Sequence, residues 1–566
     1  MKDFRMHDSK PLNAPFFTLN AEKTRYLVVG FLLALFFGIS FMSIQGKSLT
    51  TDEYSHYEYG MLILNGDAAH LTDPLMTKMP MSAWNALPGK IAVFLPDSLL
   101  KNNLERYISA RLMTTLFSML VGVLVFWWSR ELYGFIPALV SLTLYVFDPN
   151  IIAHSQLTTT DIYAAGTVTF AAYWLWRFSN TRNWRNGLWL AFALGLAQLA
   201  KYTSISLYPL SAIALLVNDL FGTRDNEILP VKNTPRMAAR YLKYTIVAFV
   251  VGVLTINIGY LFQGTFQPLS SYAFRSELLR SIQSKVDFIV PTPYPYLEGL
   301  DYVFHAERTS ADYGNIYLLG KISVIEGFKG YYFIATALKT PIATQVVLWV
   351  AFFVYIWNRE NRKYFFNNEW YPVWLVVFYG IYFNFFYNAQ IGIRYYLVEF
   401  PLLYVIAGSL FRNWKDFTAM QKRSITALGL YLCISVLSYY PNYLAYFNEF
   451  VWDRKMAYKY LADSNLDWGQ DEYVFEAYIK SHPEVKKIPD HPHPINKTWT
   501  FYLRVNELVG VSTAPPDAYA WLMENFEPTG MISPSYLLWE ITPKQMQDLC
   551  DRTDYCDGVL PNGKKP

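Results

Sequence analysis

Long apolar runs alternate with polar segments along most of this chain. The first run, "YLVVGFLLALFFGISFMSI" over residues 26–44, is long enough to span a bilayer, because about 20 apolar residues cross the hydrocarbon core. Further runs of spanning or near-spanning length, some of them hard to separate, cover residues 108–129, 134–147, 161–178, 187–200, 203–221, 240–262, 335–357, 371–387, 394–411 and 424–440. The pattern predicts a mainly α-helical, polytopic membrane protein with about 11 transmembrane helices.

Lysine and arginine residues cluster in every second segment between these runs, beginning with the N-terminal segment. The intervening short connections hold few cations, chiefly Lys201 and Arg394. Because cytoplasmic loops carry the excess of positive charge, we expect the N-terminus to lie in the cytoplasm. An odd number of crossings then places the C-terminal tail on the extracytoplasmic side.

On this topology the outer face receives most of the polar sequence, in residues 45–107, 148–161, 263–334 and 441–566. Two stretches of the first segment, "EYSHYEYGMLILNG" and "MSAWNALPGKIAVFL", are too short and mixed to span, and they predict interfacial helices. We therefore expect a transmembrane module over residues 1–440, with outer loops 45–107 and 263–334. A small extracytoplasmic α/β domain over residues 441–566 is expected to follow it.

Composition agrees with a membrane protein. Of the 566 residues, 53% are hydrophobic and only 16% are charged, whereas soluble domains carry about 25% charged residues. The net charge of +3 is too small to indicate a nucleic-acid partner. The first apolar run starts late and is long for a signal peptide, so we expect it to be retained as a span.

Three cysteines are present. Cys433 lies in an apolar run, where it is expected to be packed or to face lipid. Cys550 and Cys556 lie close together near the C-terminus. If the tail is outside the cytoplasm, these two cysteines could form a short-loop disulfide or remain as two free thiols, and the sequence does not decide between the two states.

Acidic residues at the outer ends of two spans are candidate catalytic groups. Asp52 and Glu53 follow the first run directly, and a carboxylate at the membrane edge can take the proton of a hydroxyl. Asp161 closes "TTTD" at the start of another run, so that two acids can share one site. The alternative is that these residues cap helices or lie in solvated loops.

Isolated cations on the same face are candidate phosphate ligands. Lys78, Lys201 and Arg394 lie where the charge distribution makes cations scarce, and a planar guanidinium matches phosphate oxygens. The alternative is that their side chains extend to the interface. A metal site is unknown; Glu53 and His305 are weak candidates, and a divalent cation stays open. The turn-forming, acidic stretch "ADSNLDWGQDEY" over residues 462–473 indicates a capped turn, with no spacing that requires catalysis.

Taken in order, these segments resemble the polytopic GT-C glycosyltransferases, in the family 39-like branch related to protein O-mannosyltransferases and lipid A aminoarabinose transferases. The acidic pair "DE" after the first span is the hallmark of this family. The resemblance further rests on "ARLMTTLFSML", "LTTTDIYAA", "GLAQLAKYTSISLYPL", "RYYLVEFPLLYVIAG", "YLAYFNEF" and "DSNLDWGQD". "TKMPMSAW" departs from the family's Lys-Pro-Pro stretch, since Met79 intervenes and Thr77 stands where aminoarabinose transferases carry a metal-binding glutamate.

The resemblance implies an inverting glycosyltransferase that moves a sugar, hexose or pentose, from a polyprenyl-phosphate carrier to an acceptor outside the cytoplasm. It implies Asp52 as the base and Asp161 as a second acid, and we expect Glu53 to act as a helper of Asp52. Lys78, Lys201 and Arg394 match cations that hold the lipid phosphate. The acceptor class stays open between protein, lipid and cell-envelope polysaccharide, and the resemblance favours a bacterial inner membrane. A lipid-linked sugar flippase is the main alternative, and a non-catalytic membrane scaffold is a second.

Overall fold

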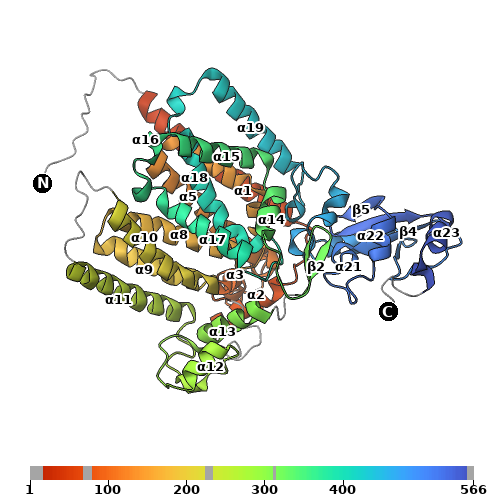
Figure 1. Cartoon of the computed structure of the whole chain (residues 1–566), viewed down its shortest axis with the longest axis horizontal. Helices are drawn as coiled ribbons and strands as arrows, with labels where there is room; N and C mark the ends of the chain where they lie inside the picture. The colour runs from red at the N-terminus through yellow and green to blue at the C-terminus, as the bar shows by residue number, and fades with distance from the viewer. Residues whose placement is uncertain (1–16, 68–78, 223–233, 310–313, 558–566) are drawn as a thin grey trace.

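The computed structural model describes residues 17–67, 79–222, 234–309 and 314–557. It is mainly helical, and helices lie at all the positions where the apolar runs predict them. Figure 1 shows most of them packed side by side in one bundle. The bundle helices are α1 (Phe17–Ile44), α5 (Tyr107–Tyr133), α6 (Phe135–Val146), α8 (Asp161–Asn180), α9 (Trp184–Gln198), α10 (Leu207–Phe221), α11 (Thr234–Gly259), α14 (Tyr331–Lys339), α15 (Ile342–Trp357), α17 (Trp370–Phe385), α18 (Phe400–Ala407) and α19 (Ala419–Leu437).

Length and composition mark a subset of these helices as membrane-crossing. Within the described residues five helical segments qualify: Arg25–Ile44, Tyr107–Tyr133, Tyr202–Phe221, Tyr241–Gly259 and Ile393–Phe411. A bent pair of helices brings the count to six. The protein is therefore an integral membrane protein, as predicted, while the expected number of about eleven spans stays a prediction.

The expected continuous span 335–357 is broken. The structure has two helices there, α14 and α15, and the helix axis bends by 117° from the first to the second. Pro341 lies between them; proline lacks a backbone N–H and disfavours helix at the preceding residue, so α14 ends at Lys339. The side-chain amide of Asn448 donates to the carbonyls of Ala337 (2.6 Å) and Thr340 (2.8 Å), which satisfies backbone groups freed by the break.

The segment 45–107 contains short helices at the two predicted amphipathic stretches, α2 (Glu53–Asn65) and α3 (Ser82–Ala92). A third short helix, α4 (Leu99–Leu104), was not predicted. Helices α2 and α3 pack closely at Gly60, where any Cβ atom would clash with the backbone carbonyl of Ser82. The lack of a side chain at this glycine therefore allows the contact. The segment 263–334 carries α12 (Glu277–Gln283), α13 (Tyr294–Thr309) and the hairpin β1 (Ile316–Leu318) and β2 (Lys321–Ser323). The short helices α7 (Pro149–His154) and α16 (Arg359–Arg362) lie in other connections before the tail.

The tail contains a four-stranded sheet with strand order β3-β4-β6-β5. The long pair β4 (Trp499–Arg504) and β6 (Tyr536–Ile541) is antiparallel, and buried Leu503, Trp539 and Ile541 alternate with more exposed neighbours. The remaining elements are α20 (Glu472–Ser481), β3 (Lys486–Lys487), α21 (Val505–Leu508), α22 (Ala520–Asn525), β5 (Gly530–Ser533) and α23 (Pro543–Arg552). Figure 1 shows this lobe projecting from one end of the bundle. The boundaries of the expected modules, 1–440 and 441–566, stay a prediction.

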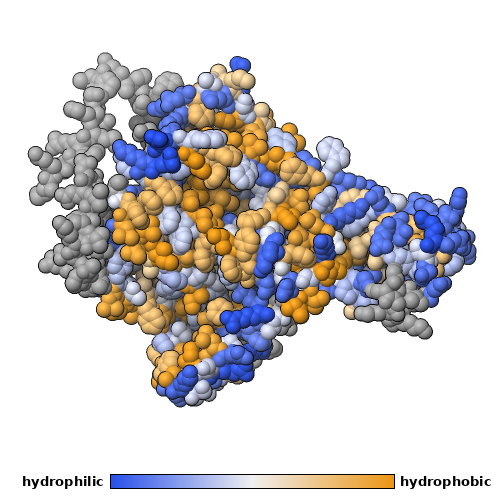
Figure 2. Space-filling model, viewed as in Figure 1, coloured by the Kyte–Doolittle hydropathy of each residue, from blue (hydrophilic) through white to orange (hydrophobic). Residues whose placement is uncertain are grey.

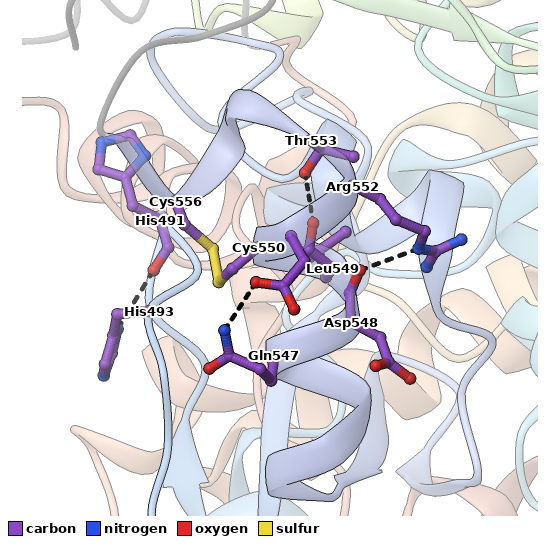
Figure 3. The surroundings of a disulfide bond; sticks show 10 residues. His491, His493, Gln547, Asp548, Leu549, Cys550, Arg552, Thr553 and Cys556 are labelled. Atoms are coloured by element: carbon purple, nitrogen blue, oxygen red, sulfur yellow. Dashed lines mark hydrogen bonds between the residues drawn. A yellow bond between two sulfur atoms is a disulfide. The ribbon is translucent and has the colours of Figure 1, made fainter.

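The surface divides along the same line. Figure 2 shows hydrophobic residues over the flank of the helix bundle, whereas hydrophilic residues gather on the projecting C-terminal lobe. Within that lobe, Cys550 and Cys556 form a disulfide that joins α23 to the following turn (Figure 3). The structure thus decides between the two states that the sequence leaves open for these cysteines. Cys433 is a free thiol.

Candidate active site

An ion pair between Asp52 and Arg394 lies at the centre of the site. Arg394, from the 3-10 segment Ile393–Glu399 that leads into α18, donates through Nη1 to Oδ2 of Asp52 at 2.9 Å. The arginine side chain is 7% exposed and the aspartate 30%, so the carboxylate is the member of the pair within reach of solvent. Asp52 occupies the N-cap position of α2, yet its carboxylate makes no capping hydrogen bond. The helix-cap alternative for Asp52 is therefore not the arrangement found.

Glu53 points away from Asp52 into the protein and is fully buried. Its two oxygens accept hydrogen bonds from Nε and Nη2 of Arg111 (2.8 and 2.6 Å), from the backbone N–H groups of Thr50 and Thr158 (2.8 Å each) and from Oγ1 of Thr50 (3.2 Å). These five bonds saturate the carboxylate and leave no oxygen for a metal ion. Glu53 instead ties the loop that carries Asp52 to α5 and to the turn before α8.

Asp161 and Lys201 form a second ion pair at 2.9 Å. Asp161 is the first residue of α8, where a negative charge faces the positive end of the helix dipole, and Lys201 lies in the break that follows α9. Nζ of Lys201 lies 4.0 Å from the ring centroid of Tyr395, and the guanidinium of Arg394 lies 5.1 Å from the same centroid. Both ion pairs therefore lie next to one aromatic ring, so the structure brings four of the predicted site residues together.

The tail contributes to this site, which the sequence did not predict. The backbone N–H of Thr51 donates to the carbonyl of Trp468 at 3.0 Å, and that of Ser48 donates to the carbonyl of Gln470 at 3.2 Å. The indole of Trp468 covers the guanidinium of Arg394, with 4.0 Å between the guanidinium carbon and the ring centroid. A desolvated contact of this kind contributes about 2 kcal/mol. The stretch 462–473 is thus docked on the acidic pair and is more than a capped turn.

Asp463 from the same stretch adds a third carboxylate. It begins a 3-10 turn, Asp463–Asn465, with a left-handed φ of 56°, and its N–H donates to Oδ1 of Asn506 at 2.8 Å. Asp463 is half-buried, and its desolvation raises its pKa to about 7; the charges of Asp467 and Asp52 act in the same direction, against that of Arg394. Non-glycine residues in this backbone conformation are uncommon and often mark functional sites.

Part of the chain matches the model of a known protein family. Residues 100–227, which include Asp161 and Lys201, match the family model described as dolichyl-phosphate-mannose-protein mannosyltransferase. The match covers less than a quarter of the chain. The match confirms the predicted resemblance to GT-C enzymes of the protein O-mannosyltransferase type, and it indicates glycosyltransferase activity in general. A search of the curated proteins finds no match.

Two solved structures are similar over most of the chain. One is ArnT from Cupriavidus metallidurans bound to undecaprenyl phosphate, with 11% identity, 90% of this chain and 97% of that chain covered, and a TM-score of 0.46. The other is the oligosaccharyltransferase AglB from Archaeoglobus fulgidus in complex with an inhibitory peptide and a dolichol-phosphate, with 12% identity, 76% and 56% covered, and a TM-score of 0.45.

A long apolar cavity lies beside the mannosyltransferase-family segment. It has a volume of about 610 Å³ and lies between α9, α10 and α11. Its lining includes Leu190, Leu194, Leu215 and Val253, and it reaches Ile205, which is four residues from Lys201 in the sequence. The cavity therefore offers apolar surface between α9, α10 and α11.

Arg394 and two residues near it carry buried polar atoms that have no hydrogen-bond partner. In the part of the chain that the structure describes, Nε of Arg394, Nδ1 of His154 and the hydroxyl of Tyr332 have no hydrogen-bond partner. Burial lowers the pKa of His154 to about 3, with Arg394, Lys339 and Lys201 acting in the same direction against Asp161, so this imidazole is neutral at physiological pH. A buried donor such as the guanidinium Nε is suited to an anion.

The remaining predicted site residues lie elsewhere or cannot be placed. Lys78 and Thr77 lie outside the described residues. His305 is on α13, and within the described ranges no group of three or more His, Cys, Asp or Glu side chains is arranged to hold a metal ion. Together with the saturated carboxylate of Glu53, this gives the weak metal candidates no shared site among those residues.

Proposed function

We propose that this protein is an inverting glycosyltransferase that moves a sugar from a polyprenyl-phosphate carrier to an acceptor at the outer face of the membrane. The observation that carries the proposal is the pair of acid–cation contacts, Asp52 with Arg394 and Asp161 with Lys201, whose cations both lie against the ring of Tyr395. The family match over the segment that supplies Asp161 and Lys201 supports it.

We assign the donor phosphate to the cations. Lys201 and the unpartnered Nε of Arg394 can donate hydrogen bonds to phosphate oxygens, and Lys78 is a further candidate. Negative charge grows on the phosphate as its bond to the anomeric carbon breaks, so fixed cations stabilise the transition state more than the ground state. Loss of one such donor typically slows the reaction ~10²–10³-fold. Asp161 holds Lys201 in place.

We assign the acceptor to Asp52. Its partly exposed carboxylate would accept the proton of the acceptor hydroxyl while the oxygen attacks the anomeric carbon, a contribution of ~10²–10⁴ in rate. Attack from the side opposite the leaving phosphate inverts the anomeric centre. Glu53 would act as the helper by fixing the loop around Thr50, as its five hydrogen bonds indicate.

The carrier requires a site at the edge of the bilayer, because its head is charged and its tail is apolar. The cavity between α9, α10 and α11 offers apolar surface for a prenyl chain, and its lining residue Ile205 is four residues from Lys201 in the sequence. The cation distribution favours a cytoplasmic N-terminus, and the Cys550–Cys556 disulfide favours an oxidising compartment for the tail. We therefore propose a bacterial inner-membrane location with the C-terminal domain outside the cytoplasm.

Mass spectrometry tests this function directly. Glycolipids, envelope proteins and surface polysaccharides are compared between cells that express the wild type and cells that express Asp52→Asn. We expect a sugar-sized mass on one acceptor class in the wild type only, with hexose or pentose read from the mass. Identical profiles in both strains would contradict the proposal.

A further inference from the structure

We propose that Asp463, in the tail, is a positioning residue for Asp52: when ionised, it shares the charge of Arg394 with Asp52 and makes Asp52 a stronger proton acceptor. The inference rests on the proposed function, and it gives the C-terminal lobe a part in the reaction.

The position of Asp463 is built by contacts from two directions. Asn506 of the lobe accepts from the N–H of Asp463 and donates to the carbonyl of Asp467, both at 2.8 Å, and so closes the turn. On the bundle side, the N–H of Ile393 donates to Oδ1 of Asn465 at 3.0 Å. The turn is thereby fixed against the residue that precedes Arg394.

Gly392 makes this close approach possible. Its φ is +127°, and a Cβ atom there would clash with Oγ of Ser464. Only glycine adopts this conformation readily and leaves room for the serine. The turn Asp463–Asn465 and the segment that carries Arg394 therefore pack directly against each other.

The charges around Asp463 differ from those around its neighbour. Asp467 is neutralised by Arg504, which donates to it through Nε at 2.6 Å and Nη2 at 2.9 Å. Among the described residues no lysine or arginine forms an ion pair with Asp463, whose Oδ1 accepts from the N–H of Ser464 at 2.5 Å. The ionisable groups that act on it or respond to it are Arg394, Asp52, Asp467 and Tyr331.

Ionisation of Asp463 changes the balance at Arg394. With Asp463 neutral, Asp52 holds the direct ion pair with the guanidinium, on which Asp161 also acts. Asp52 is then a weak base, because a paired carboxylate holds a proton poorly. With Asp463 ionised, a further carboxylate competes for the guanidinium and repels Asp52, and both effects strengthen Asp52 as a base. Since burial raises the pKa of Asp463 to about 7, this change falls in the physiological range.

The test is the pH dependence of sugar transfer by full-length protein in liposomes, with a synthetic polyprenyl-phosphate sugar. For the wild type we expect the rate to rise with pH through an apparent pKa near 7. Asp463→Asn cannot ionise, so its plateau should fall about three- to tenfold and its acid limb should move to lower pH. Glu484→Gln, at an exposed acid of the lobe, serves as the control and should match the wild type.

A second variant guards against misfolding. Asp463→Gly removes the carboxylate and accepts the left-handed backbone, so it should show the same altered profile in a protein at least as stable as the wild type. If both variants keep the wild-type plateau and acid limb, the role of Asp463 is overturned.

A readout that needs no activity separates this proposal from the proposed function. A carboxyl whose pKa is raised by folding costs stability once it ionises. The wild type should therefore lose thermal stability relative to Asp463→Asn as pH rises from about 4 to about 7, and the gap should then stay constant. Parallel curves would contradict the inference. A wild type that shows this gap but transfers no sugar would contradict the proposed function instead.

Discussion

Arg394 and Asp52 are 342 residues apart in the sequence, and their side chains form a 2.9 Å ion pair between the start of α2 and the segment before α18. Trp468 of the tail covers the arginine from a third part of the chain. The site thus forms only when the first outer loop, the penultimate predicted span and the tail are all in place.

Asp52→Asn tests the base directly. Asparagine keeps the shape of the side chain and can still accept a hydrogen bond from Arg394, but it cannot take a proton. We expect sugar transfer to fall ~10²–10⁴-fold while carrier binding and thermal stability stay close to the wild type. Transfer rates and binding of a fluorescent carrier measure the two effects separately. Near-normal turnover would show that another group is the base.

Arg394→Lys tests whether the fork geometry matters. Lysine keeps the positive charge but cannot donate to Asp52 and to a phosphate oxygen in one plane, and it stacks less well on Trp468. We expect a loss of ~10² in kcat/KM for the donor. A variant with full activity would mean that charge alone suffices and that the phosphate is held elsewhere, for example by Lys201.

The pair Glu53 and Arg111 is expected to matter for folding more than for chemistry. Glu53→Ala leaves a buried arginine without its partner, so the free energy of unfolding should drop by about 3–5 kcal/mol. Thermal unfolding in detergent measures the effect. Asp97→Ala breaks the surface pair with Lys101, in which the aspartate is 97% exposed, and should leave thermal stability close to that of the wild type. Similar effects of both changes would contradict the assignment of Glu53 as the structural tie.

Gly392→Ala tests whether docking of the tail matters for the site. The new methyl group would displace Ser464 and its turn from the segment of Arg394, and the positive φ adds strain. We expect transfer to fall at least about tenfold, a barrier change of about 1.4 kcal/mol, together with faster proteolysis of the 462–473 stretch. Gly429→Ala in α19 is the matched control, because no atom lies within 4 Å of its added Cβ. Equal activity of the two variants would show that the contact is dispensable.

The local features of the sequence predicted the helices well. An apolar run of spanning length needs no distant partner, so α1, α5 and α11 lie where the runs predict them. The break between α14 and α15 also has a local cause, Pro341, but the run around this proline is long and apolar enough to predict one continuous span. Which of these helices cross the membrane depends on the bilayer as well as on the run.

The site was predictable only in part. Lys201 and Arg394 stood out because cations are scarce in every second connection between the apolar runs, and Asp52 and Asp161 because they lie at the predicted outer ends of such runs. The contribution of Asp463 and Trp468 did not, since their partners lie far away in the sequence. Glu53 was readable as an acid beside Asp52, but its burial depends on Arg111, 58 residues away, and on Thr158, 105 residues away.

Release of the carrier is the most direct measurement of the central claim. Purified protein in liposomes receives a synthetic polyprenyl-phosphate sugar and an extract of envelope acceptors, and free polyprenyl phosphate is measured by mass spectrometry. We predict that the wild type releases it in step with sugar on the acceptor, and that Asp52→Asn releases almost none. Movement of the intact sugar-lipid across the bilayer without cleavage of its glycosyl bond would contradict the account and indicate a flippase.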